Sequence, residues 1–456
     1  MVSHKNNYTT SSFFQFSPFI IFLITYSSLY IYNFNIKSIS TSSIASIPLF
    51  ASLVATIYAF STYKENIKLD RKIEIFFSGM MHIDIINSYF MILSLAIFNH
   101  MMAKTNGILT VITLSLLYIP ASWIMIFLFL FAAGTSICII SLPATVIMCM
   151  PITYGIAQSL HISTEFMIAT IISGALFGNH LLVYERTRSF RKAPSTTKIL
   201  FDSLKNPIFV IIPAAITTLF FLSQSHIEQI HPNIYEKIYS SFKNDTFITI
   251  IPYVLLYIGA FFRTNLIANL IISSCSAFFI AILYQKILLL DAISNLVTGF
   301  SNNNILFYIL FLHLMIAGLI KTIKYNGGFN YITERINAKN YKKSAYFQFL
   351  ILIITIINSM LTIIDGLSFN SITITIKKLI DQFNIPHHTI IVFSHVTTTV
   401  IQSILPYSAT MLLIMTTTHA AYFNIIHYMI YPIVLSISMI ISIFCTNHSL
   451  HQKKLS

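Results

Sequence analysis

Two apolar stretches of this chain share one pattern: TSICIISLP at residues 135–143 and TTVIQSILP at residues 398–406. Each begins with two hydroxyl residues and ends in Leu-Pro, and a further hydroxyl follows at Thr145 or Ser408. Proline removes a backbone donor and disfavours the α conformation in the residue before it. We therefore predict an interrupted helix in each stretch, at corresponding places in two related halves of the chain.

The composition indicates a chain that folds in a membrane. Of its 456 residues, 56% are hydrophobic and only 9% are charged, and the mean hydropathy is +0.77. That leaves too little polar surface to cover a water-soluble globule. The apolar runs lack period-two alternation, so they predict helices rather than barrel strands. We expect an all-α polytopic fold of about eleven to thirteen transmembrane helices. The runs long enough to cross a bilayer lie at 17–35, 44–62, 85–103, 108–130, 131–160, 165–184, 206–224, 247–262, 266–285, 304–322, 345–365, 388–413 and 420–445.

Basic residues gather in three short loops, and their placement predicts the topology. Cytoplasmic loops carry an excess of Lys and Arg, so the net charge of +13 indicates membrane orientation rather than a nucleic-acid partner. We expect a multi-pass protein of the cell (inner) membrane with a cytoplasmic N-terminus. An even number of crossings must separate the first two loops, so one segment between 108 and 160 is expected to be re-entrant or broken, with breaks at Gly134-Thr135 and at Pro143. The three loops contain Lys64, Lys68, Arg71, Lys72; Arg186, Arg188, Arg191, Lys192, Lys198, Lys205; and Lys321, Lys324, Arg335, Lys339, Lys342, Lys343.

The expected organisation is two transmembrane halves around an extracytoplasmic loop. We divide the chain into a polar N-terminal segment (1–16), an N-terminal half (17–224), the loop (225–246), a C-terminal half (247–445) and a polar tail (446–456). Unwound backbone persists at membrane depth only where it lines protein or a water-filled cavity, so two related breaks favour a transporter built from repeats.

Other classes of protein lack their characteristic residues. The sequence has no Walker loop, no zinc-protease motif and no long polar loop, so we expect neither an enzyme nor a bound cofactor. A quinone-linked proton pump would place Lys and Glu in the middle of several helices, whereas the lysines here lie almost wholly in loops. The four cysteines lie in apolar runs without paired metal spacing, so we interpret them as core residues: Cys138, Cys149, Cys275 and Cys445.

Several short patches resemble, in order, the NhaC-type Na+/H+ antiporters. In the first half these are FAAGTS at 131–136, Pro151-Ile152, and SGALFGNH at 173–180. The family reads roughly G-T-S-W-G-T, a proline-containing helix, and S-G-A-x-F-G-D-H. The second half is similar at Gly327-Gly328, Ile364-Asp365-Gly366, Asn370, Ile380-Asp381-Gln382-Phe383, Thr397-Thr398-Thr399 and Leu405-Pro406-Tyr407-Ser408. The resemblance covers roughly positions 45 to 415 and implies two halves meeting at a midplane site.

The chain departs from the family pattern at acidic positions. Asn179 stands where the family has an acid, and the polar run that follows in the family is replaced by LLVYERTR at 181–188. Gly366 follows Asp365 where the family has a second aspartate, and His395 occupies another acidic position. The chain therefore has fewer carboxylates for Na+ and proton binding than the family pattern.

The resemblance and the hydroxyl pattern together give the candidate site. Na+ prefers hard oxygen ligands, and proton exchange needs a group that titrates. We expect Asp365 to be the principal proton-coupling group and His395 to be a second one. No metal other than Na+ is expected. The candidate ion or substrate ligands are Thr135, Ser136, Asn179, His180, Asp365, Asn370, Thr398, Thr399 and Ser408.

Each candidate also has an ordinary structural interpretation. Asp365 closes an apolar run and could be a helix-end residue at the outer headgroups. Asn179 and His180 could line a pocket or cap a helix at the cytoplasmic face. His395 could carry a proton or hydrogen-bond a neighbouring helix, and helical Ser and Thr commonly bond their own backbone carbonyls.

The sequence thus favours a secondary transporter that exchanges Na+ for protons by alternating access. One alternative is a diverged carrier of a small organic solute, such as an amino or organic acid, with the same fold. Another is a degenerate paralogue that does not transport. The expected partners are the lipid bilayer and the ions Na+ and H+, and a homodimer is an assembly that the sequence leaves open.

Overall fold

A computed structural model describes the chain at residues 13–35, 41–63, 67–139, 141–181, 207–224, 244–262, 264–301, 304–328, 331, 344–361 and 387–452. These residues form helices and the turns between them, and no strand occurs among them. The predicted all-α polytopic class is confirmed.

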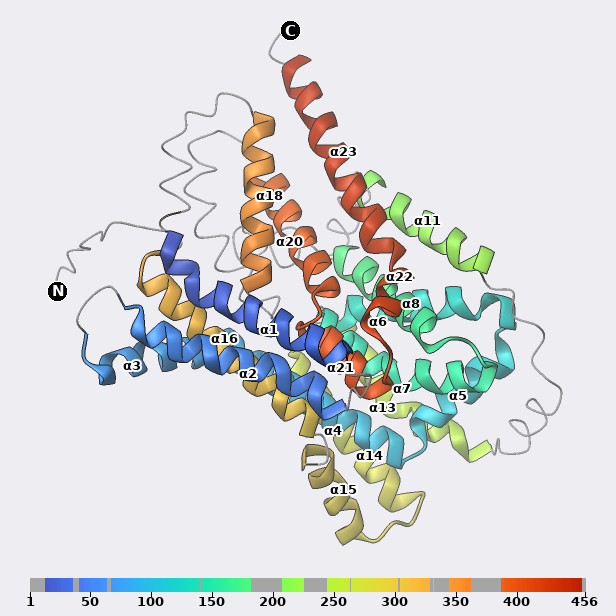
Figure 1. Ribbon diagram of the computed structural model, residues 1–456. Coiled ribbons are helices and arrows are strands. Elements are labelled where there is room, and N and C mark those ends of the chain that lie inside the picture. The colour runs from blue at the N-terminus through green and yellow to red at the C-terminus, as the bar shows by residue number, and fades with distance from the viewer. Residues whose placement is uncertain are drawn as a thin grey trace. The chain divides into compact units, whose positions relative to one another are not determined.

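Figure 1 shows the helices of the described residues. In chain order the α-helices are α1 (Ser17–Asn35), α2 (Thr41–Ser61), α3 (Leu69–Met80), α4 (Ile83–Lys104), α5 (Gly107–Tyr118), α6 (Ile124–Ile139), α7 (Leu142–Leu160), α8 (Thr164–Leu181), α11 (Pro207–Gln224), α13 (Ile251–Phe261), α14 (Leu266–Leu283), α15 (Leu289–Ser301), α16 (Asn304–Tyr325), α18 (Ser344–Leu361), α20 (His387–Ile404), α21 (Ala409–Thr418), α22 (Tyr422–His427) and α23 (Ile430–Gln452). The 3₁₀ segments are η1 (Phe13–Phe16), η2 (Ala121–Trp123) and η4 (Asn244–Ile250).

Many of these helices are apolar enough to lie in a bilayer. Among the described residues, seven segments have the length and composition to cross a membrane: Phe13–Asn33, Ile44–Ser61, Ile83–Lys104, Ala121–Ile139, Leu266–Leu283, Leu306–Tyr325 and Ser394–Thr418. Shorter apolar helices occupy Gly107–Tyr118, Ile211–Gln224, Phe247–Phe261, Ile351–Met360 and Ile430–Ile441. The chain is therefore a multi-pass membrane protein.

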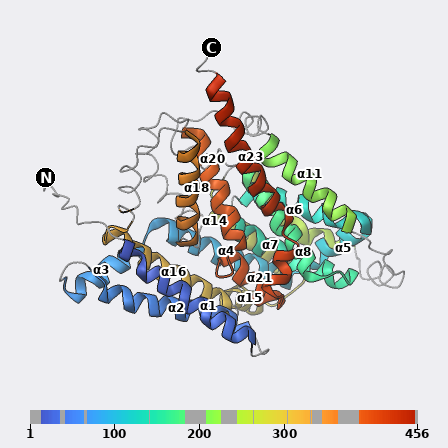
Figure 2. The ribbon, with the colours of Figure 1, turned by 45° about the horizontal axis from the view of Figure 1, so that its top comes forward.

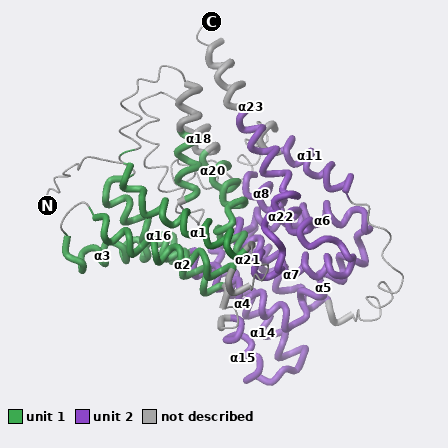
Figure 3. Tube along the Cα trace, viewed as in Figure 1, with its two compact units in different colours: residues 1–87, 305–412 green, residues 88–304, 413–456 purple. Residues whose placement is uncertain are grey.

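The chain divides into two compact units, each built from distant parts of the sequence (Figure 3). Unit 1 comprises Met1–Asn87 and Ile305–Leu412, and unit 2 comprises Ser88–Asn304 and Leu413–Ser456. Each unit draws on both predicted halves, 17–224 and 247–445. The relation of those halves as structural repeats stays a prediction.

In unit 1, side-chain contacts join the N-terminal hairpin to the end of α16. Helices α1 and α2 pack along each other (Figure 2). Tyr63, just after α2, hydrogen-bonds through its hydroxyl to Thr322 near the end of α16 at 3.3 Å. Phe13, just before α1, contacts the ring of Tyr331 with the centroids 6.3 Å apart. The start of α1 and the ends of α2 and α16 thus share one end of this unit.

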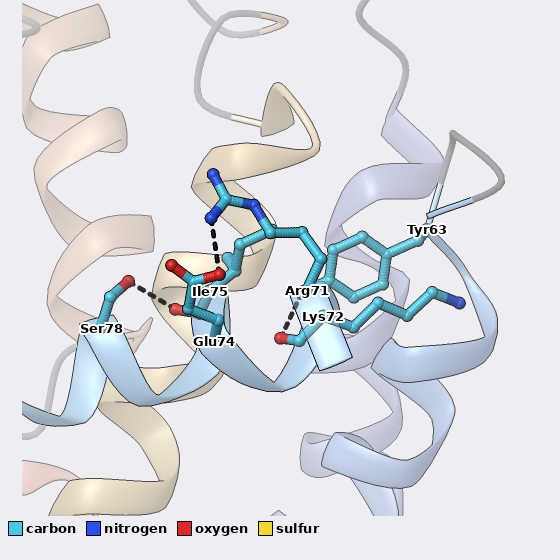
Figure 4. Close-up of polar contacts among 6 residues, drawn as sticks. All are labelled: Tyr63, Arg71, Lys72, Glu74, Ile75 and Ser78. Atoms are coloured by element: carbon cyan, nitrogen blue, oxygen red, sulfur yellow. Dashed lines mark hydrogen bonds and ion pairs between the residues drawn. The ribbon is translucent and has the colours of Figure 1, made fainter. Parts of the chain in front are cut away.

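Helix α3 lies between the first basic loop and α4, and hydropathy had not predicted it. Its buried face packs on α16, where Phe76 covers Gly318. Figure 4 shows the opposite face, where Arg71 and Glu74 form an exposed ion pair at 2.6 Å. Lys72 reaches back to α2: its Nζ donates to the carbonyl of Phe60 at 2.7 Å and lies 5.2 Å from the centre of the Tyr63 ring. A lysine placed there stabilises the C-terminal carbonyls of α2.

In unit 2, the segment that the topology required to be irregular contains one short helix and two longer ones. Helix α5 has 12 residues, which span only about 18 Å at 1.5 Å per residue, too little to cross a bilayer core. It packs on α7, where the Ile112 side chain covers Gly155. Within 108–160, α5 is therefore the segment too short to cross, and α6 and α7 are two separate helices that meet around Ser141.

Helices α6 and α8 pack closely because α8 presents two glycines, one turn apart. A Cβ built on Gly174 would overlap the backbone of Phe129, and one built on Gly178 would overlap the backbone of Ala133. Both pairs are 45 positions apart, so the two helices run parallel. The small-residue run of the SGALFGNH segment serves this contact, as small residues do in membrane helix pairs.

Candidate functional site

At the first predicted break the chain leaves the helical conformation, but it turns there from α6 into α7. Helix α7 runs back antiparallel to α6, because α8 is parallel to α6, so a single interrupted helix at this place is not what the structure has. Helix α6 ends at Ile139, Ser141 is extended with φ −145° and ψ 122°, and α7 begins at Leu142. Pro143 lies in the first turn of α7, where its missing N–H leaves no helical hydrogen bond unmade. The prediction of a further break at Gly134-Thr135 is wrong, because α6 continues through both residues.

The second predicted break occurs between α20 and α21, in unit 1. Helix α20 ends at Ile404 and α21 begins at Ala409. Ser408 starts the new helix, since its Oγ accepts the backbone N–H of Met411 at 3.2 Å. The single apolar span expected at 388–413 is therefore two helices with an unwound turn between them.

Tyr407 anchors the second break against the middle of a membrane helix. Its ring contacts Phe22 and Tyr26, the sixth and tenth residues of the 19-residue α1, with centroids 5.2 and 5.4 Å apart. Its hydroxyl donates to the carbonyl of Met360 at 2.9 Å. Since α1 lies in a candidate membrane span, this break is at mid-depth of that helix.

The hydroxyl residues before the first break bond to neighbouring helices. Thr135 Oγ1 lies 2.6 Å from the hydroxyl of Tyr257 on α13, and it also bonds the carbonyl of Phe131 at 2.7 Å. Ser136 Oγ donates to the carbonyl of Ala175 on α8 at 2.7 Å. Both side chains are fully buried, so they contribute polar groups inside unit 2 as well as bonding their own helix.

The corresponding pair before the second break behaves similarly. Thr398 Oγ1 lies 3.0 Å from Ser359 Oγ on α18, whereas Thr399 Oγ1 donates to the carbonyl of His395 at 3.1 Å. His395 itself is buried in α20, with 2% of its surface exposed. Thr398, Thr399, His395 and Ser408 thus lie together in unit 1, around the end of α20.

Asn179 and His180 are buried in the last turn of α8. His180 Nδ1 lies 3.4 Å from the hydroxyl of Tyr431 on α23, and the two rings stack with centroids 6.1 Å apart. Asn179 is 1% exposed, and neither atom of its amide has a hydrogen-bond partner in the described part of the chain. Their burial argues against the interpretation as an exposed helix cap, and the pocket interpretation stays a prediction.

The remaining two candidates cannot be placed. Asp365 and Asn370 lie outside the described residues. The two breaks belong to different compact units, so the prediction that they meet at one polar chamber stays a prediction. Within the described ranges, no group of three His, Cys, Asp or Glu residues could hold a metal ion.

Unit 2 also contains polar residues that sequence reasoning missed, which we call the Thr135 cluster: Thr135, Cys149, Tyr253 and Tyr257. Cys149 on α7 hydrogen-bonds through its side chain to Thr135. Tyr253 lies one turn before Tyr257 on α13, and its buried hydroxyl has no partner among the described residues. Cys149 had been interpreted as an apolar core residue, although the i, i+4 spacing of the two tyrosines indicates one helix face.

A second missed group compensates for the proline inside α7. Pro151 has no N–H, so the carbonyl of Ile147 loses its helical hydrogen bond. Asn99 on α4 supplies the replacement, because its Nδ2 donates to that carbonyl at 2.7 Å. Its Oδ1 is buried without a partner in the described ranges. A polar side chain from a neighbouring helix is one way in which membrane helices tolerate proline.

The fold defines a polytopic all-α membrane protein. No protein-family model matches the chain, and no curated protein matches it.

Proposed function

We propose that this protein is a secondary carrier that exchanges a monovalent cation, Na+ in the first instance, for protons by alternating access. The observation that supports it most strongly is the interrupted apolar span α20–α21 of unit 1, with buried hydroxyl groups in the turns before the break. Broken helices in transporters present backbone carbonyls and helix ends to ions near the midplane. The resemblance to NhaC-type antiporters points to the same class.

The residues around each break suit a small, hard cation. Thr135, Ser136, Thr398 and Ser408 offer neutral oxygens, and the carbonyls at the ends of α6 and α20 carry partial negative charge. Asp365 is the proposed proton-coupling carboxylate. Placing a carboxylate next to an apolar run costs free energy, and a role in proton coupling would explain why the sequence has one there.

Orientation and location follow from the basic loops. The ends of α2 and α16, which the first and third basic loops follow in the sequence, share one end of unit 1. We propose that this end is cytoplasmic, because positive loops resist translocation, and that the N-terminus lies on the same side of the inner membrane.

A second candidate function is the transport of a small polar organic solute. It is favoured by Asn179, whose buried amide could both donate and accept hydrogen bonds to such a solute. An amide with no partner in an apolar interior is costly, and a bound solute would satisfy it.

Proteoliposomes containing a pH-sensitive dye distinguish these functions. We expect an imposed Na+ gradient to drive proton movement, with Li+ and K+ gradients setting the selectivity. Asp365→Asn should abolish this exchange. The matched control is Asp291→Asn, which removes an exposed carboxylate from α15 and should leave exchange unchanged. Full exchange by Asp365→Asn would remove that residue from the mechanism, and uptake of labelled amino or organic acids without ion exchange would favour the second function.

A further inference from the structure

We propose that the Thr135 cluster is the cation-binding site of unit 2, with Tyr253 and Tyr257 as its principal oxygen ligands. The proposal rests on the proposed cation exchange and assigns that exchange a specific site. It places the ion among three helices of one unit, α6, α7 and α13, beside the first break.

Contacts connect three of the four side chains. Thr135 is four residues before the end of α6 and contacts both Tyr257, at 2.6 Å, and Cys149. Tyr253 lies one turn before Tyr257 on the same face of α13. The ring of Phe98 packs edge-on against Tyr253, with centroids 5.2 Å apart, and fixes its position.

The hydrogen bonds within this cluster leave the two tyrosine oxygens able to accept further bonds or to bind a cation. Thr135 has a single hydroxyl proton, and the carbonyl of Phe131 at 2.7 Å is an acceptor only. Tyr257 must then donate to Thr135, so the lone pairs of the Tyr257 oxygen stay available. The hydroxyl of Tyr253 makes no hydrogen bond in the described part of unit 2. Two phenolic oxygens, one helical turn apart, thus have unused acceptor capacity.

The C-terminal end of α6 determines the charge of the ion that this site would attract. The carbonyls of the last turn of α6 have no intrahelical partners and carry partial negative charge, which favours a cation within a turn of Ile139. The four cluster residues are all neutral oxygen or sulfur groups. Such a site accommodates a monovalent ion that retains little water better than a divalent ion, which needs carboxylates.

A role in packing alone does not explain why residue 253 is a tyrosine, because its hydroxyl has no described partner. A buried Tyr253 hydroxyl without a partner costs free energy, and phenylalanine would fill the same volume without that cost. A residue present only for packing would therefore be at least as stable as Phe. A bound cation gives the hydroxyl a use that packing does not.

The rate at which Cys149 is alkylated can report whether a cation occupies the site. It is fully buried, so alkylation requires the unit to open. We would keep Cys149 as the single cysteine, replacing Cys138, Cys275 and Cys445 with alanine, and follow N-ethylmaleimide labelling by mass spectrometry. Labelling in NaCl, LiCl and KCl would be compared with choline chloride at equal ionic strength.

We expect Na+ to slow labelling of Cys149 in a saturable way. Tyr253→Phe should raise the half-protecting Na+ concentration at least about fivefold, the effect of losing one liganding oxygen, while the melting temperature is unchanged or higher. The matched control is Ser273→Ala, which removes another buried hydroxyl without a described partner from α14 and should leave protection unchanged.

Three results would overturn the site: no effect of any of the cations, an unchanged midpoint in Tyr253→Phe, or no labelling of Cys149 under any condition. If the wild-type protein still exchanges Na+ for protons in liposomes, such a result refutes this site and leaves the proposed function standing. Saturable protection without exchange would instead support the site and refute the proposed function.

Discussion

Substitution of Gly178 by alanine tests the close packing of α6 and α8 that holds the first break in place. A Cβ at Gly178 would lie 2.9 Å from the Cα of Ala133 and closer still to its carbonyl oxygen, whereas ordinary contacts are 3.4–4 Å. The helices must separate by about 0.5–1 Å, and such overpacking costs about 1–3 kcal/mol. Alanine recovers up to about 1 kcal/mol of helix propensity. We expect a net loss of about 1–2 kcal/mol, a five- to thirtyfold change in the folded-to-unfolded ratio.

Gly134→Ala is the matched control, because it adds the same methyl group to the partner helix. No atom lies within 4 Å of its Cβ position, and the residue is exposed. Its apparent melting temperature in detergent, measured by loss of the monodisperse chromatographic peak after heating, should equal or exceed that of the wild type. Gly178→Ala should melt at a lower temperature. Equal melting temperatures for the two variants would refute the proposed packing.

Two further predictions concern polar contacts made by a single side chain. Asn99→Leu leaves the Ile147 carbonyl without a partner and should lower the free energy of unfolding by about 1–3 kcal/mol. Pro151→Ala restores the backbone donor to that carbonyl, so the double variant should recover much of the lost stability. If the two effects are simply additive in chemical unfolding, Asn99 does not compensate for Pro151. Lys72→Met removes a helix-end hydrogen bond and a ring contact and should cost about 1 kcal/mol, again measured by thermal stability. Arg71→Met removes only an exposed ion pair and should leave the melting temperature unchanged, and an equal loss in both variants would argue against a specific role for Lys72.

The two breaks could be predicted because their cause is local. Pro143 and the Leu405-Pro406 pair alter backbone hydrogen bonding within a few residues, so the sequence alone indicates where a helix must stop. Gly134 misled for the same reason: a glycine can end a helix, but here it lies on an exposed face within α6. The all-α class was equally accessible, because it depends on composition and the length of apolar runs.

What the sequence could not predict depends on partners distant in the chain. The carbonyl freed by Pro151 is visible from the sequence, but its donor, Asn99, is brought to it only by the packing of α4 on α7. Tyr253 and Tyr257 share a face that the sequence reveals, whereas the contact of Tyr257 with Thr135 requires the fold. Hydropathy did not predict α3, because averaging over a window detects long apolar segments and not a half-buried amphipathic helix.

The candidate ligands divide in the same way. Ser136 and Thr398 were chosen from their spacing before a proline, and both bond across to another helix. Asn179 was chosen from the resemblance, and its burial without a described partner is a feature that only the fold reveals. Asp365, the carboxylate on which proton coupling depends, lies outside the described residues, so its role stays a prediction.

Water access to the two breaks tests the central claim most directly, because unwound backbone in a carrier must line the transport path. Single cysteines at Ser141 and Ser408, in the chain freed of its other cysteines, would be exposed in sealed vesicles to a membrane-impermeant thiol reagent from each side in turn. The account predicts that both positions are labelled and that Na+ changes the side or rate of labelling. If neither cysteine reacts from either side while a lipid-soluble reagent labels both, the breaks are dry packing defects and the carrier interpretation is contradicted.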